Sequence, residues 1–184
     1  SRYEEKVKEA VAKAHLVFYV NGTNKKPETS TARKIHAYLG RGSRLCPLVN
    51  VRGSADAYEF EEDRVALEQG GADKALEQTV GVLESMLGKD AMLEGHCVQG
   101  LLGFSALAYQ PDQDATTIHP DRERDLVVQQ RNYLKYFRTP RAMYEFSQLK
   151  PVARVLHNKL DTFKEDIVES NKAKASELLS ENIE

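Results

Sequence analysis

The stretch "RLCPLVNVRGSAD", residues 44–56, decides the fold that this sequence predicts. Its first half is apolar, from Leu45 to Val49, and it changes to polar residues at Asn50. A continuous apolar run bounded in this way is typical of a strand that is covered on both faces, as in parallel sheets. We therefore predict a buried strand over 45–51. The polar residues at and beyond its carboxyl end are Asn50, Arg52, Gly53, Ser54 and Asp56.

Two further apolar runs extend this strand into a sheet. Residues 15–23, "HLVFYVNGT", form the first, and residues 96–109, "HCVQGLLGFSALAY", are expected to form a strand that ends at Ser105-Ala106. Segments with helical periodicity, 26–40 and 57–88, separate the runs. This alternation predicts an α/β fold, a parallel sheet with helical crossovers. The carboxyl ends of such strands share one edge of the sheet, and open α/β sheets bind ligands there.

The chain changes to helices near its carboxyl end. Prolines stand where three of these helices are expected to begin: Pro120, Pro140 and Pro151. In the last helix, apolar residues recur at three- and four-residue steps from Leu156 to Ile167. We expect an α/β part over 1–118 and a helical segment over 119–184. The final helix either packs within the domain or belongs to a stalk.

Composition excludes several classes of function. The 26 basic and 28 acidic residues give a net charge of −2, which does not favour nucleic acid or an anionic membrane as a general partner. Cys46 and Cys97 each lie in an apolar run and are expected to be buried free thiols, which suits a reducing cytoplasm. No spacing of Cys and His indicates a metal site. The chain opens directly in a helical pattern, "SRYEEKVKEAVAKA", and we expect it to be a fragment.

These runs resemble the second half of a GTPase domain, most closely that of the bacterial dynamin-like large GTPases. In that family, one strand ends in an Asn/Thr-Lys-x-Asp motif that reads guanine, and a Ser-Ala-x motif on the next strand lies behind it. Here "VNVRGSAD" stands in the first place and "FSAL", residues 104–107, in the second. The segments "KAHLVFYVNG", "MYEFSQL" and "FKEDIVESNKAKASELL" extend the resemblance, in order, over nearly the whole chain.

The resemblance implies half of a site for GTP or GDP. Val51 stands where the family has Lys, and Gly53 where it has Asp, so Arg52 and Asp56 are the expected substitutes for the aliphatic stem and the carboxylate. An ordinary loop with Asp56 as a helix N-cap is the alternative. For the Ser-Ala segment, the alternative is a plain strand end. The residues expected at the nucleotide are Asn50, Arg52, Gly53 and Asp56 around the base, with Ser105, Ala106 and Leu107 behind it.

The phosphate side of such a site is not found in this sequence. It contains no G-x-x-x-x-G-K-[ST] motif; "GLLGFS", residues 100–105, has no lysine and is expected to end a strand without opening a helix. The resemblance implies that the P-loop and the Mg²⁺ ligands precede Ser1. We expect no catalytic residues and no metal ligands here, and this chain alone should hydrolyse neither GTP nor ATP.

The resemblance also implies a role for the intact protein. It would be a cytoplasmic GTPase, peripheral at a membrane, that self-assembles and remodels that membrane, and this chain would pair with the missing N-terminal half. One alternative is a non-enzymatic α/β interaction module with a helical docking arm. Another is an α/β enzyme of a different family that binds a small molecule at the same edge of the sheet.

Overall fold

The computed structural model describes residues 2–24, 27–40, 42–67 and 71–181. Three parallel strands form one sheet in the order β1-β2-β3: β1 (Leu16–Gly22), β2 (Arg44–Asn50) and β3 (His96–Val98). Helix α1 (Arg2–Lys13) precedes β1. Helix α2 (Thr29–Tyr38) connects β1 to β2, and α3 (Ala72–Leu87) connects β2 to β3. The predicted α/β class and the parallel direction of the strands are confirmed.

The strands end level with one another. In the register of the sheet, Gly22 of β1 lies beside Asn50 of β2, and Asn50 lies beside Val98 of β3. The central strand is buried because its neighbours and α3 cover it; Leu45, Cys46 and Val49 are 0% exposed. The change from apolar to polar residues at Asn50 therefore coincides with the carboxyl edge of the sheet.

The third strand is much shorter than predicted. It ends at Val98, and α4 (Gly100–Leu107) follows at once, so the expectation that 96–109 is a strand, and that "GLLGFS" does not open a helix, is wrong. The side chain of Gln99 accepts a hydrogen bond from the Leu102 amide at 2.8 Å and so caps the new helix. Periodicity could not reveal this helix because a short apolar run reads equally as a buried strand or a buried helix.

The segment between β2 and α3 also departs from the predicted helix. Two 3₁₀ turns, Ala55–Tyr58 and Glu61–Arg64, replace the first half of the helix expected over 57–88. Gly71 precedes α3 with φ of 91°, a left-handed conformation that glycine adopts without strain. Gly70, the other glycine expected to split the helix, lies outside the described residues.

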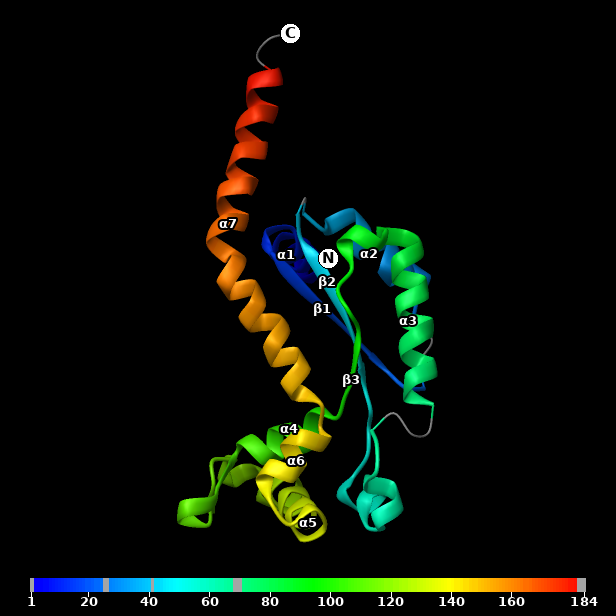
Figure 1. Ribbon diagram of the computed structural model, residues 1–184, viewed down its shortest axis with the longest axis vertical. Coiled ribbons are helices and arrows are strands. Elements are labelled where there is room, and N and C mark those ends of the chain that lie inside the picture. The colour runs from blue at the N-terminus through cyan, green and yellow to red at the C-terminus, as the bar shows by residue number, and fades with distance from the viewer. Residues whose placement is uncertain (1, 25–26, 41, 68–70, 182–184) are drawn as a thin grey trace.

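Helices lie on both sides of the sheet (Figure 1). On one face, Ala32 of α2 and Leu83 of α3 form a buried cluster with Leu45 of β2. On the other side of the sheet, α7 (Leu149–Glu181) leaves the lower helices and runs upward past the strands (Figure 1). Its Phe163 ring meets the His15 ring edge to face, with 5.3 Å between centroids.

A second group of helices lies at the carboxyl edge of the sheet (Figure 1). Here α4, α5 (Val128–Phe137) and α6 (Pro140–Phe146) pack together around buried aromatic and aliphatic side chains. Pro140 opens α6, Pro120 opens a 3₁₀ turn, and Pro151 lies in the first turn of α7, close to the predictions. The remaining elements are the strands Tyr109–Gln110 (β4) and Ala115–Thr116 (β5), the 3₁₀ turns Lys89–Ala91, Pro111–Gln113 and Pro120–Arg122, and the π-helical turn Glu123–Val127.

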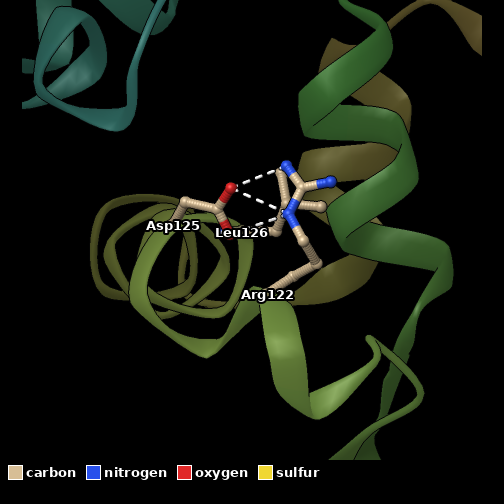
Figure 2. A network of polar contacts seen from close by, with 3 residues as sticks. All are labelled: Arg122, Asp125 and Leu126. Carbon is tan, nitrogen blue, oxygen red and sulfur yellow. Dashed lines mark hydrogen bonds and ion pairs between the residues drawn. The ribbon is translucent and has the colours of Figure 1, made fainter.

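A surface ion pair lies in the segment that precedes α5. The Arg122 guanidinium donates to both carboxylate oxygens of Asp125, and the same carboxylate accepts from the Leu126 amide at 2.7 Å (Figure 2). The Arg122 hydrogen bonds lower the pKa of Asp125. Because both side chains are exposed, this network does not form a buried site and contributes little to stability.

Both cysteines are buried thiols, as predicted. The Cys46 thiol donates to the Glu94 carbonyl at 3.4 Å, and burial raises the pKa of Cys46 to about 11. In the described part of the chain, none of the helices combines the length and the hydropathy that crossing a bilayer requires.

Candidate functional site

Side-chain amides lie at the carboxyl ends of β1 and β2. Asn21 donates from Nδ2 to the Thr79 hydroxyl of α3 at 3.3 Å, in a buried position. Asn50 accepts from the Gly100 amide through Oδ1 at 3.0 Å. A Cβ at Gly100 would stand 3.3 Å from that Oδ1, so a side chain there would crowd the contact. Asn50 thus ties the end of β2 to the turn that opens α4.

Gln99 joins the same turn to the loop that follows β2. Its side chain is 1% exposed, and its Nε2 donates to the Gly53 carbonyl at 3.0 Å and to the Tyr133 hydroxyl at 3.2 Å. Its Oε1 is occupied by the Leu102 amide. Both Nε2 hydrogens of Gln99 are therefore used within the protein, and its buried side chain holds the loop.

Tyr133 of α5 holds the loop from the other side. Its hydroxyl donates to the Gly53 carbonyl at 2.8 Å, so two donors converge on one oxygen. Gln129, one turn earlier on α5, accepts from the Ala55 amide at 2.8 Å. The backbone over 53–55 is consequently fixed by side chains from α5 and from the β3–α4 junction.

Burial changes the acidity of this cluster. Desolvation raises the pKa of Tyr133 to about 12, against 10.0 for a free tyrosine, and it also raises the pKa of Tyr58, whose ring packs 6.2 Å from that of Tyr133. Both hydroxyls are neutral at physiological pH. They act here as hydrogen-bond donors or apolar surfaces and not as bases.

We expect this burial to make the protein sensitive to alkali. The unfolded chain ionises Tyr133 near pH 10 and the folded chain only near 12, so the free energy of unfolding falls as pH rises through that window, by on the order of 2 kcal/mol. Tyr133→Phe should reduce the dependence of the free energy of unfolding on pH, as measured by urea unfolding at pH 9 to 12. Tyr3→Phe, at a position 79% exposed, is the control and should leave the slope unchanged. Equal slopes for both variants would contradict the assignment.

The outward side of the loop carries the charged residues. Arg52, Ser54 and Asp56 are exposed, whereas Ala55 between them is fully buried. Within the described residues, neither the Arg52 guanidinium nor the Asp56 carboxylate has an ion pair or hydrogen bond. The N-cap of the 3₁₀ turn is Ser54, without a side-chain cap bond, so the interpretation of Asp56 as an N-cap is wrong. A cation and a carboxylate thus face solvent from a fixed backbone.

The second predicted group lies elsewhere. Ser105, Ala106 and Leu107 belong to α4 and not to a strand end, because the chain turns into helix at Gly100. Ser105 is fully buried; its carbonyl accepts from Gln130 at 2.8 Å, and its hydroxyl is without a hydrogen-bond partner among the described residues. Leu107 is 67% exposed. Gln99-Gly100 occupies the strand end, and the Gln-Gly pair after "HCV" was the signal available in the sequence.

Comparison with known proteins assigns no role to this edge. Protein families, curated proteins and solved structures gave no match. Two hollows of about 360 and 460 Å³ lie away from the loop, one along the outer edge of β3 and one between α5 and the β4–β5 hairpin. Within the described ranges, no group of three His, Cys, Asp or Glu side chains could hold a metal ion.

Proposed function

We propose that the carboxyl edge of the sheet is the base-recognition half of a GTP or GDP site, in a fragment of a dynamin-like GTPase. The observation that supports this most is the loop over 51–56. It lies at the edge where α/β sheets bind ligands, and its backbone is held by Gln99 and Tyr133. It presents Arg52 and Asp56 without partners among the described residues.

Each residue has a chemical role in this proposal. The Asp56 carboxylate accepts hydrogen bonds from the N1 and N2 donors of guanine, which adenine does not offer. The aliphatic stem of Arg52 covers the face of the ring, since long basic side chains pack their stems on flat apolar surfaces. Asn50 and Gly53 position the loop, and the Gly100 turn takes the place behind the base that the sequence indicated for Ser105 to Leu107.

Catalysis belongs to the other half of the site. The sequence holds no P-loop, so the phosphates and Mg²⁺ would be bound by residues outside this chain, and the isolated chain should show no GTP or ATP turnover. Joined to that half, the protein would hydrolyse GTP and self-assemble. As part of this proposal, the protein would be cytoplasmic and would remodel a membrane to which it binds peripherally.

A titration followed by NMR tests base recognition directly. Guanosine added to the ¹⁵N-labelled chain should shift the amides of 51–56 and 99–100, and adenosine should do so much less. Asp56→Asn should lower the affinity for guanosine, as determined from these shifts, about tenfold, because a hydrogen bond to a charged group contributes about 1.5–3 kcal/mol. Glu59→Gln, at an exposed carboxylate three residues further on, is the matched control.

Two results would overturn this function. One is equal shifts with guanosine and adenosine, which would remove the base specificity. The other is the absence of any shift around 51–56, which would leave the interaction module as the better description. That alternative has one observation in its favour, the exposed apolar side chains of α7.

A further inference from the structure

The hollow between α5 and the β4–β5 hairpin has a volume of about 460 Å³. On the helical side, α5 and its N-cap contribute Val127, Gln130, Arg131 and Leu134. Positions i, i+3, i+4 and i+7 share one face of a helix, so this face of α5 is turned toward the hairpin. Small-molecule sites occupy about 300–1,000 Å³. The hollow is therefore large enough for a small ligand.

A buried amide at this hollow lacks one of its hydrogen bonds. Gln130 lines the hollow although it is only 2% exposed. Its Nε2 donates to the Ser105 carbonyl of α4 at 2.8 Å, whereas its Oε1 has no hydrogen-bond partner among the described residues. A buried carbonyl oxygen without a donor is costly, and most such atoms in proteins have a partner. A ligand with an N–H group would supply the missing donor.

Two opposite charges line the same hollow and do not pair with each other. The Arg131 guanidinium has neither an ion pair nor a hydrogen bond in the described part of the chain. Asp114 accepts from the Tyr109 hydroxyl through Oδ1, which leaves its Oδ2 open. A guanidinium binds carboxylates, and a carboxylate binds ammonium groups. The hollow thus offers a separate position for each charge of a zwitterion.

The other lining residues and the balance of charge narrow the class of ligand. Val127 and Leu134 are apolar and Tyr109 is aromatic, so together they suit an apolar side chain. A ligand that is only anionic would meet the Asp114 carboxylate, and one that is only cationic would meet the Arg131 guanidinium. Like charges select against both. The carboxyl terminus of a peptide would bring no cation to Asp114.

We propose that this hollow binds a free α-amino acid with an apolar side chain. The carboxylate of the ligand pairs with Arg131, and its ammonium group donates to Asp114 and to the Oε1 of Gln130. The side chain of the ligand packs on the apolar and aromatic walls. One small molecule in this way satisfies both unpaired charges and the buried oxygen. The hollow is separate from the loop over 51–56, so the proposal does not rest on nucleotide binding.

Titration of the ¹⁵N-labelled chain with L-leucine and with L-phenylalanine tests the proposal. At least one of them should shift the amides of 109–116 and 127–134 and reach saturation by about 10 mM. Two derivatives of the amino acid that binds test the reading of its charges. The N-acetyl derivative lacks the cation and the amide derivative lacks the anion, so each should bind at least about tenfold more weakly.

Matched variants test the two charged residues. Arg131→Gln and Asp114→Asn each remove one charge and should each weaken binding about tenfold. Asparagine also tolerates the left-handed backbone of Asp114, whose φ is 47°, so this substitution should preserve the hairpin. Arg124→Gln and Asp112→Asn are the controls. Both side chains are exposed in neighbouring turns and do not line the hollow, so the affinity should stay unchanged.

Three outcomes would overturn the proposal. The first is the absence of saturable shifts around the hollow with both amino acids. The second is equal affinity for the free amino acid and its N-acetyl derivative, which would show that the ammonium group is not recognised. The third is an equal loss of affinity in Arg131→Gln and Arg124→Gln, which would place the bound carboxylate elsewhere. Unchanged amide shifts outside the hollow show that each variant has kept its fold.

Discussion

Gly103→Ala is expected to lower the free energy of unfolding by about 3 kcal/mol. A Cβ at this position would lie 2.2 Å from Cδ1 and 2.8 Å from Cγ of Leu149, and 2.9 Å from the Ser147 hydroxyl. All three distances are shorter than a van der Waals contact, and they involve the junction between α6 and α7, where the backbone N–H of Gln99 donates to the Ser147 carbonyl at 2.9 Å. Accommodating the methyl group requires the Leu149 and Ser147 side chains to move from their packed positions, or α4 and α7 to separate.

Gly81→Ala is the matched control for this prediction. Gly81 is also a helical glycine, but a Cβ added there would have nothing within 4 Å, and the residue faces solvent on α3. The substitution should stabilise the protein by about 1 kcal/mol, because alanine loses less backbone entropy in a helix. Urea unfolding of both variants measures the contrast. Loss of stability of similar size in both would show that the α4–α7 contact is not tight.

Phe18→Lys is expected to weaken self-association of the isolated chain by about tenfold or more. In the described part of the chain, β1 has a strand neighbour on one side only, β2. The strand is apolar, with Val20 60% exposed, and it has neither Pro nor Lys to block pairing with another chain. We therefore expect the isolated chain to dimerise or aggregate through β1, and a lysine in the strand to oppose this.

Sedimentation across a range of concentrations measures the association. Gln78→Lys, on the exposed face of α3, is the control and should leave it unchanged. Val20→Lys is a second test that disturbs the core less, because this side chain already faces solvent. A wild-type chain that stays monomeric at high concentration, or equal effects of the strand and helix variants, would contradict association through β1.

Periodicity predicted the parts of the fold that depend on local patterns. The strands over 15–23 and 45–51 were recognisable because each is a continuous apolar run closed by Asn, and the parallel pairing followed from the helices between them. The strand over 96–109 was overextended because the exposed positions of α4 are apolar as well: Phe104 is 45% exposed and Leu107 is 67% exposed. Its sequence then shows no alternation of polar and apolar residues that would distinguish helix from strand.

The candidate site was predictable only on its solvent side. Arg52 and Asp56 could be named from the loop itself, since both follow directly from the end of a strand. The contacts that hold the loop could not, because Tyr133 lies 80 residues from Gly53 in the sequence. A tyrosine at helical spacing among other aromatic residues indicates a core position, and only the folded chain shows that its hydroxyl reaches the loop.

The buried thiols give the protein a built-in chemical reporter. Cys46 and Cys97 lie in adjacent strands of the sheet, 0% and 4% exposed, and the high pKa of Cys46 leaves almost no thiolate at neutral pH. Alkylating reagents react with the thiolate and must reach it. Both native cysteines are therefore unreactive as long as the sheet remains folded. A fluorophore can thus be attached at one added surface cysteine without removing either. The rate at which Cys46 and Cys97 are alkylated then measures how often the sheet unfolds locally.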